Sequence, residues 1–234
     1  MKAINITISP FELVEILDVE ISKCINQHGS AWVKGIIDEE AEDMYVGMSL
    51  SEVSVTITAS DYDGSKQALF QGVLEDMKIS VENGLNIIEL SIMPYSRILD
   101  LVQENRVFQD PNITYNRLVK STLAPYSEAY ALINAGDGQA IGQMFVQYQE
   151  TAWTFLKRMA SMNNDVVVPN DTLSGVWLYF GFPNKHATNT SPLSPISYSM
   201  KKNVSDYIYK RDNNVLSVSE YDSVCYIVKD REVR

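Results

Sequence analysis

The sequence has few of the residues on which most catalytic and metal sites depend. Its 234 residues contain two histidines, His28 and His186, and two cysteines, Cys24 and Cys225. It has no Cys-x-x-Cys and no His-Glu-x-x-His spacing, which excludes the common zinc motifs. Cys24 and His28 are four residues apart, but Gly29-Ser30 follows directly, so we interpret them as an ordinary thiol and a surface histidine. No catalytic, cofactor-binding or metal-binding residue is assigned, and no cofactor is expected.

Long apolar runs and an excess of positive charge are also missing. The longest strongly apolar run, Val176 to Phe182, is far shorter than the roughly 20 residues that cross a bilayer. Met1 to Phe11 lacks the continuous apolar stretch of a secretory signal. Nineteen Lys and Arg against thirty Asp and Glu give a formal net charge of -11, which repels phosphate backbones and anionic lipids. We therefore expect no nucleic-acid binding through basic patches, no membrane insertion by this chain, and reduced, buried thiols.

The first hundred residues have the pattern of antiparallel strands. Apolar and polar residues alternate from Ile4 to Ile8, from Val53 to Ile57 and from Met77 to Val81, which is typical of half-buried strands. Asp63-Gly64 and Asn83-Gly84 suit the positive backbone angles of tight hairpin turns. Several short strands joined by hairpins need closure to protect their edges, so we expect a small barrel.

An acidic stretch interrupts these strands. Residues 38 to 43 include five carboxylates and no apolar periodicity of their own. A cation site would need ligand spacing like that of an EF-hand, which is not found here. We predict a solvated loop.

Helical periodicity begins near residue 96. Ser96 is a suitable N-cap for a short helix over residues 98–102, and Thr114 for a second helix. The strongest helix signal in the chain runs from Ala152 to Met162, with Thr151 as its N-cap. Strands and helices are thus mixed in this part of the sequence.

The final part of the chain returns to strand patterns. Residues 184–195 are rich in Ser, Thr, Asn and Pro and are the best linker candidate. The strands beyond it are few for a closed barrel, so we predict that this region is incomplete. The fold class expected is mainly β with an α/β insertion. The expected domains are a first β-barrel at 1–97, an α/β middle domain at 98–184, and the start of a second β-barrel at 185–234.

An ordered set of short motifs between residues 69 and 183 resembles the tail hub family of contractile phages and injection systems. That family includes late control protein D and the N-terminal part of VgrG spikes. A Phe-x-Gly strand comes first, and an Arg-x-Phe-Gln-Asp segment follows. A Val-Gln-Tyr-x-Glu strand then leads directly into a Trp-x-Phe-Leu-x-Arg helix. The residues that carry this signature, each with an expected structural role, are Phe70, Gly72, Arg106, Phe108, Gln109, Asp110, Gln147, Tyr148, Glu150, Trp153, Phe155, Leu156 and Arg158.

The resemblance implies a structural role and not a chemical one. It implies two small β-barrels that flank an α+β domain, and a trimeric ring that joins the sixfold tail tube to the threefold spike machinery. The partners implied are two further copies of the chain, the tail tube or tube-initiator protein, the spike or tip protein, and baseplate or wedge proteins. Assembly in the bacterial cytoplasm into a virion tail or a released tail-like particle is implied as well. The chain is therefore expected not to be an enzyme.

Two other functions are compatible with the residues. Thirty carboxylates supply many acid pairs of the kind that cleave glycosidic bonds, so a cell-wall hydrolase component of a tail particle is one alternative. The other is a β-module that binds carbohydrate or docks onto a tail. Trp153 and Trp177 lie in apolar patterns, and we expect them to fill cores and not to stack on sugars.

Overall fold

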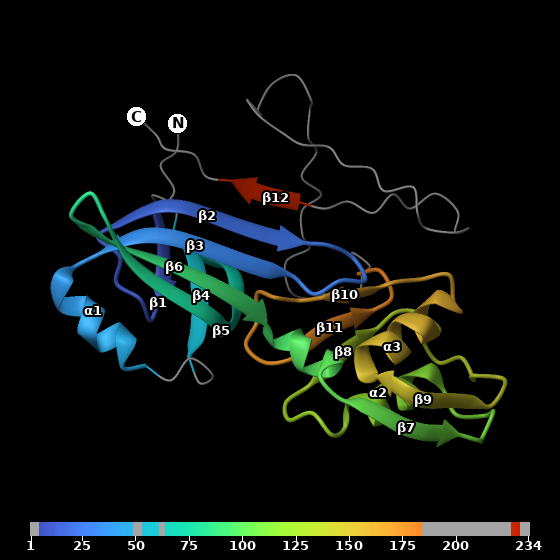
Figure 1. Ribbon diagram of the computed structural model, residues 1–234. Helices are drawn as coiled ribbons and strands as arrows, with labels where there is room; N and C mark the ends of the chain where they lie inside the picture. Colours follow the sequence, from blue (N-terminus) through green and yellow to red (C-terminus); the bar gives the residue numbers. More distant parts are fainter. Residues whose placement is uncertain (1–4, 49–52, 61–63, 184–225, 230–234) are drawn as a thin grey trace.

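The computed structural model describes residues 5–48, 53–60, 64–183 and 226–229. Figure 1 shows a long, curled sheet on one side and a smaller α/β unit on the other. The fold is mainly β with an α/β unit inserted, as the sequence predicts.

The large sheet has seven strands, and every pairing in it is antiparallel. Alternating side chains along its strands point to a common core, so the period of two in the sequence is confirmed. In spatial order the strands are β1 (Asn5–Ser9), β4 (Ser54–Ser60), β5 (Lys66–Glu82), β6 (Leu85–Pro94), β3 (Ser30–Ile37), β2 (Glu15–Lys23) and β12 (Tyr226–Lys229).

The long strand β5 curls this sheet. Its first part pairs with β4 and its second part with β6, and Gly72 lies where the two pairings overlap, opposite Val55 and Pro94. A Cβ atom at Gly72 would overlap the main-chain carbonyl of Met93, so only glycine allows the strands to approach this closely. The hairpin from β5 to β6 turns at Asn83-Gly84, where both residues have positive φ, of 52° and 79°.

The acidic stretch is a helix, so the prediction of a loop is wrong. Helix α1 (Glu39–Val46) begins after Asp38, whose carboxylate accepts a hydrogen bond from the Glu39 amide at 2.8 Å. Acidic residues in the first turn suit the positive end of the helix dipole. Tyr45 anchors the helix: it is fully buried, its ring lies 5.0 Å from Phe11, and its hydroxyl accepts a hydrogen bond from the Glu12 amide.

The α/β unit surrounds two helices with short strands. Strands β10, β11 and β8 form one small sheet, and β7 and β9 form an antiparallel ribbon of two strands. The elements in chain order are η2, a 3-10 helix (Tyr95–Asp100), β7 (Gln103–Phe108), α2 (Tyr115–Leu123), β8 (Tyr130–Ile133), β9 (Phe145–Thr151), α3 (Ala152–Ser161), β10 (Val167–Pro169) and β11 (Trp177–Phe180).

Two of the three predicted helix starts are confirmed. The side chain of Thr114 accepts a hydrogen bond from the Arg117 amide at the start of α2, and that of Thr151 accepts one from Thr154 at the start of α3. Ser96 does not cap a helix, because it is buried inside the 3-10 helix η2, which begins one residue earlier. Its hydroxyl is used for a tertiary contact described below.

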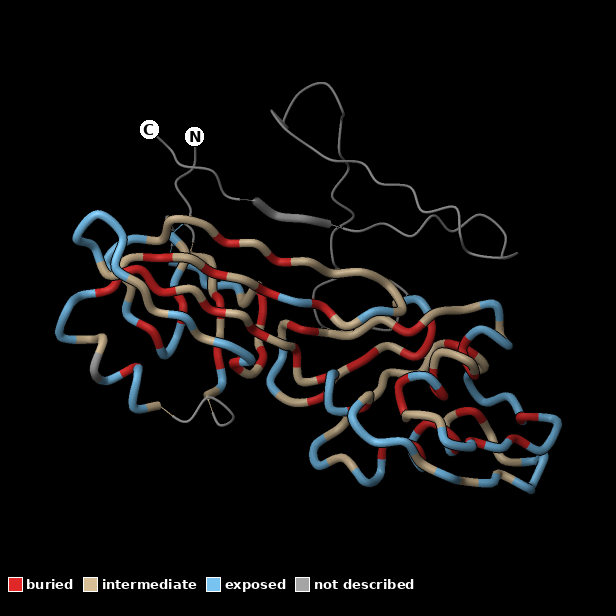
Figure 2. The backbone as a smooth tube through the Cα atoms, viewed as in Figure 1, coloured by how far each residue is buried: buried red, intermediate tan, exposed pale blue. Residues whose placement is uncertain are grey.

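The molecule has two hydrophobic cores. In Figure 2 buried segments follow the strands of the large sheet and, separately, helix α3. The first core lies inside the curled sheet and includes Val33, Ile57, Phe70, Ile88 and Leu90. The second lies under α2 and α3 and includes Leu118, Trp153, Phe155, Leu156 and Phe180.

Part of the predicted second barrel lies outside the described residues, as does His186. The one strand described beyond residue 183 is β12, which pairs with β2 at the edge of the large sheet. The domain boundaries at 97 and 184 stay predictions. Cys24, which follows β2, is disulfide-bonded, so the prediction of a reduced thiol at this position is wrong. No helix among the described residues has the length and apolarity of a membrane span.

Candidate functional site

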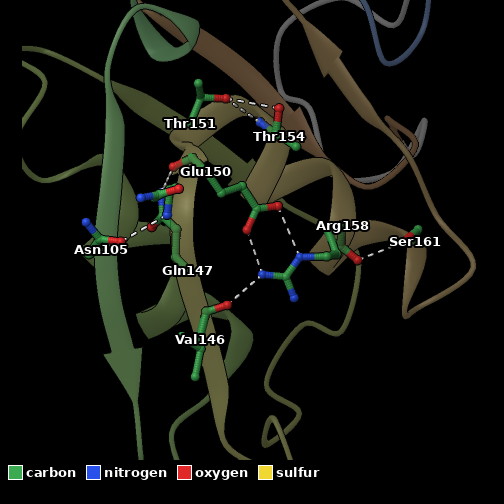
Figure 3. Close-up of polar contacts among 9 residues, drawn as sticks. Asn105, Val146, Gln147, Glu150, Thr151, Thr154, Arg158 and Ser161 are labelled. Atoms are coloured by element: carbon green, nitrogen blue, oxygen red, sulfur yellow. Dashed lines mark hydrogen bonds and ion pairs between the residues drawn. The ribbon is translucent and has the colours of Figure 1, made fainter.

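Three signature residues, Gln147, Glu150 and Arg158, lie close together where β9 leads into α3 (Figure 3). Glu150 and Arg158 form an ion pair. Arg158, on α3, donates two hydrogen bonds to the carboxylate of Glu150, on β9: Nε at 3.1 Å and Nη2 at 2.7 Å. The same Nη2 donates to the main-chain carbonyl of Val146 at 2.8 Å. The Arg158 guanidinium also lies 5.1 Å from the ring of Phe155. Such a forked pair fixes the helix against the preceding strand.

Strand β9 contains a bulge just before Glu150. Glu104 is opposite Glu150 and Arg106 is opposite Gln147, so Tyr148 and Gln149 together face the single residue Asn105. Gln149 has a positive φ of 46°, and its amide donates a hydrogen bond to the Asn105 side chain at 2.9 Å. A bulge of this kind redirects side chains.

The bulge turns two signature residues in opposite directions. Gln147 is fully buried, and its Nε2 donates to the carbonyl of Glu150 at 2.8 Å. Tyr148 points outward and is 70% exposed.

Arg106 holds the ribbon to helix α2. Its Nη1 donates to the carbonyl of Thr122 at 2.9 Å, and its guanidinium forms an ion pair with Glu104. The hydroxyl of Tyr126 donates to Glu104 at 3.1 Å. Burial lowers the pKa of Arg106, partly offset by Tyr126, and the pKa of Tyr126 is raised by burial.

Apart from Tyr148, the aromatic signature residues pack in or against the cores. Phe108 stacks on Phe155, with ring centroids 5.6 Å apart and planes 11° apart. Trp153, Phe155 and Leu156 are buried in the second core, and Phe70 is fully buried in the first. The expectation that Trp153 fills a core is confirmed, while Trp177 is half-buried and packs its ring 4.4 Å from that of Tyr130.

Gln109 and Asp110 are exposed and lie at the end of β7. Asp110 Oδ1 accepts hydrogen bonds from the main chain and the side chain of Asn112, at 2.9 and 3.1 Å. The pair therefore shapes the turn that leads to α2. The structure thus places the signature residues in two cores, one ribbon and one turn, and not around a common cavity.

A second cluster, absent from the predicted set, joins the large sheet to the α/β unit. His28 follows β2, and its ring lies 4.2 Å from that of Trp153. Its Nδ1 shares a hydrogen bond with Ser96 Oγ at 3.0 Å, and its Nε2 lies 3.7 Å from Asp100 Oδ2. Asp100 accepts a hydrogen bond from Thr151 Oγ1 at 2.6 Å. The prediction of a surface histidine is wrong, because only 11% of the His28 side chain is exposed.

Ser96, His28 and Asp100 have the residue types of a hydrolase triad. Their surroundings differ from those of a catalytic triad. Ser96 is 3% exposed and the Trp153 ring covers the imidazole, whereas a nucleophile must reach a substrate. Burial lowers the pKa of His28 to about 4; Asp100 opposes this shift, and Arg97 and Lys157 add to it. A general base is most effective with a pKa near the working pH. The cluster is built as a packing contact.

A third contact brings a buried carboxylate to the sheet. Asp171 is 4% exposed, and burial raises its pKa to about 6 despite the charge of Lys23. Its carboxylate lies so close to Gly29 that a Cβ there would overlap it. Its carbonyl accepts a hydrogen bond from the Gln71 amide at 2.6 Å. Burial also lowers the pKa of Lys23, whose Nζ donates to the carbonyl of Leu69 at 2.8 Å.

Among the described residues, no three His, Cys, Asp or Glu side chains lie where they could hold a metal ion. An open hollow of about 440 Å³ on α2 is lined by six residues, none of which is a carboxylate, histidine or cysteine: Thr114, Asn116, Arg117, Lys120, Ser121 and Ala124. In the cluster of Ser96, His28 and Asp100, Ser96 is 3% exposed, and 11% of the His28 side chain and 25% of the Asp100 side chain are exposed.

Comparison with known proteins identifies the fold. Neither a protein-family model nor a curated protein matches the chain. Solved structures of two tail proteins and a secretion-system component match it over about three quarters of its length, so the chain shares their fold. One is the 43 kDa tail protein of prophage MuSo2 from Shewanella oneidensis, with a TM-score of 0.54 and 13% identity, over 76% of this chain and 53% of that one.

Two further structures agree with it. The tail protein from Neisseria meningitidis has a TM-score of 0.55 and 15% identity, over 76% of this chain and 51% of that one. The third structure is an E. coli component of the type VI secretion system, described as structurally similar to the T4 bacteriophage tail proteins gp27 and gp5. It has a TM-score of 0.51 and 15% identity, over 75% of this chain and 48% of that one. This chain therefore spans about half the length of the proteins it matches.

Proposed function

We propose that this chain is a structural hub subunit of a contractile tail or tail-like particle. In this proposal three copies form a ring that joins the sixfold tail tube to the threefold spike. The observation that carries the proposal is the shared fold with two tail proteins, one of them from a prophage, and with a secretion-system component, over three quarters of the chain. The ordered signature from Phe70 to Arg158 supports the proposal. Several of its residues pack in the two hydrophobic cores, and Arg158 and Glu150 join α3 to β9 by two hydrogen bonds.

The packing of the chain suits a mechanical role. Three separate contacts tie the large sheet to the α/β unit: His28 with Trp153, Gln71 with Asp171, and Asn26 with Val167, where a 2.8 Å hydrogen bond runs in each direction. Several contacts spread along a junction resist hinge motion better than one. A ring subunit that transmits force needs such a rigid junction.

The proposal assigns no catalytic step to this chain. Its partners are the tube or tube-initiator protein, the spike or tip protein, and baseplate or wedge proteins. Assembly takes place in the bacterial cytoplasm, before the tail or tail-like particle is released. The two alternatives, a cell-wall hydrolase and a carbohydrate-binding or tail-docking module, would act without a ring.

Native mass spectrometry of the purified chain, alone and with purified tube and spike proteins, tests the proposal. The expected result is a species of three times 26.4 kDa, and a larger complex when tube or spike protein is added. A chain that stays monomeric at high micromolar concentration and binds neither protein would refute it. Release of soluble fragments from purified peptidoglycan would favour the hydrolase, and binding of a monomer to a glycan array would favour the carbohydrate module.

A further inference from the structure

The ribbon of β7 and β9 has an outer face without charge. The exposed side chains of this face are apolar or polar without charge, although the chain as a whole carries 49 charged residues in 234, 19 basic and 30 acidic. Four large side chains stand out on this face: Val107 is 53% exposed, Met144 59%, Val146 41% and Tyr148 70%. The neutral polar residues beside them are Gln103, Asn105, Gln109 and Gln149.

The charged residues of the ribbon all turn to the other side. Glu104 and Arg106 pair with each other, Arg106 contacts Thr122 of α2, and Glu104 contacts Tyr126, which follows this helix. Glu150 is held by Arg158. Val107 and Val146 are directly opposite each other in the register, so their side chains form one apolar row. Depletion of charge together with exposed Tyr, Met and Val is the composition of the centre of a protein interface.

The two edges of the ribbon differ. Side chains already occupy two main-chain carbonyls of β9: Arg158 donates to that of Val146, and Gln147 to that of Glu150. Within residues 64–183, β9 is the only strand that pairs with β7. Strand β7 runs along the lower margin of the molecule in Figure 1, away from the large sheet. Among the described residues this second edge of β7 is unpaired, and it has no proline and no lysine between Gln103 and Phe108, two of the usual protections of an edge strand.

We propose that the free edge of β7, with the apolar row beside it, is a docking site for an extended segment of a different protein of the particle. The segment adds a strand to β7 by main-chain hydrogen bonds, and its side chains that meet Val107, Val146 and Tyr148 are uncharged. Strand addition of this kind draws affinity from the main chain and specificity from alternate side chains. The uncharged face selects against charged segments, because an unpaired charge buried there would be costly.

This choice of occupant rests on the proposed function. Two copies of the chain could pair β7 with β7, but that contact is isologous and builds a two-fold dimer, whereas a threefold ring requires a different contact between copies. The face has no basic residue that would recognise phosphate, which also sets it apart from a nucleic-acid or anionic lipid site. A neutral strand from a neighbouring protein is the partner whose chemistry matches.

Site-specific photo-crosslinking in assembled particles tests the inference. Val107 is replaced by p-benzoylphenylalanine, and the particles are irradiated and analysed by mass spectrometry. A crosslink to an uncharged, extended segment of another particle protein supports the proposal. A crosslink to a second copy of this chain would overturn the proposal. So would the absence of any crosslink in particles that contain the substituted protein. The control places the same residue at Lys120, which is exposed on α2, and should not crosslink to that segment.

The crosslinked protein then allows an affinity test with matched variants. Val107→Lys places a charge on the face, whereas Val107→Thr keeps the β-branched shape. We expect Val107→Lys to weaken binding by about tenfold or more, and Val107→Thr by about twofold or less. Equal effects of the two variants, or no effect of Val107→Lys, would overturn the proposal.

The mass of the free protein separates the two proposals. A Val107→Lys protein that still forms trimers but no longer binds supports the site. Loss of the trimer in this variant would show that β7 joins copies of the chain, which contradicts the site proposed. A wild-type chain that is not trimeric, yet crosslinks through position 107 to another particle protein, would refute the ring and leave the docking site standing.

Discussion

The indole ring of Trp153 lies against the imidazole ring of His28, with centroids 4.2 Å apart and planes 33° apart. Trp153 belongs to the core of the α/β unit, and His28 follows strand β2 of the large sheet. The contact therefore joins two units whose sequences are separated by more than a hundred residues. Its geometry leads to the first two predictions.

Replacing Trp153 should destabilise the whole chain. Trp153 is 1% exposed, and a large-to-small change at such a site costs about 3–5 kcal/mol. Trp153→Phe keeps a ring and should cost less. Urea unfolding followed by circular dichroism gives both values. A near-neutral effect of Trp153→Ala would contradict the burial seen in the structure.

Two buried groups should act on stability in opposite directions as pH falls. The pKa of His28 is lowered from 6.5 to about 4 in the folded chain, so the unfolded chain binds this proton first and stability falls from pH 6.5 towards pH 4. The pKa of Asp171 is raised from 3.8 to about 6, so the folded chain binds this proton first and stability rises over the range from pH 6 to pH 3.8.

Single variants should separate these two effects. Asp171→Asn should lose stability more steeply than the wild type on acidification from pH 6.5 to pH 4, because only the effect of His28 is left at this junction. His28→Gln should lose it less steeply than the wild type. Thermal unfolding at a series of pH values measures both slopes. Parallel pH profiles for the three proteins would show that these groups do not titrate as described.

The Glu150–Arg158 pair should show measurable coupling. Two hydrogen bonds join the side chains, but 39% of the Arg158 side chain is exposed, so solvent screening reduces the coupling to about 1 kcal/mol. A double-mutant cycle with Glu150→Gln and Arg158→Gln measures it, because each change removes one charge of the pair. The control is Lys34 with Glu82, a single 3.4 Å contact with a half-exposed carboxylate, for which about 0.5 kcal/mol or less is expected. Equal coupling in the two cycles would contradict the structural difference.

Gly72 should be among the least replaceable residues of the large sheet. A Cβ at this position would overlap the Met93 carbonyl, and overpacking of this kind costs about 3 kcal/mol. Gly138 is a matched control, because its φ of 69° strains any other residue but no atom lies within 4 Å of the added Cβ. Gly138→Ala should cost about 1 kcal/mol. Comparable losses in the two variants would show that the contact with Met93 can relax.

Local patterns in the sequence predicted the elements well. The alternation from Val53 to Ile57, the turn at Asn83-Gly84 and the caps at Thr114 and Thr151 depend on neighbouring residues, and the structure confirms all of them. The ordered motifs from residue 69 onwards indicated the fold for the same reason, because each motif is a short stretch of one element.

Features that depend on distant residues were missed. Helix α1 has no apolar periodicity, and one buried residue, Tyr45, fixes it against Phe11 and Glu12. His28 looked exposed because its neighbours are polar, whereas Trp153 covers it from another part of the chain. Asp171 gave no signal at all, since its burial results from the approach of Gly29 and Gln71.

The free edge of β7 could not be found from sequence for the opposite reason. Val107 and Val146 follow the ordinary alternation of strands, and nothing in that alternation says which face will be covered. Only the register of the two strands and the inward direction of Glu104 and Arg106 show that the apolar row is on the outside.

The junction between the sheet and the α/β unit also sets an order of events during synthesis. Asn26 meets Val167 across 141 residues of sequence, and Gln71 meets Thr172 across 101. A nascent chain on the ribosome therefore displays the flank of its sheet, with Gly29 and Gln71, long before the segment that covers it has emerged. Contacts this distant in sequence form slowly, so this flank of the sheet can be covered only after residues 167–172 have been synthesised.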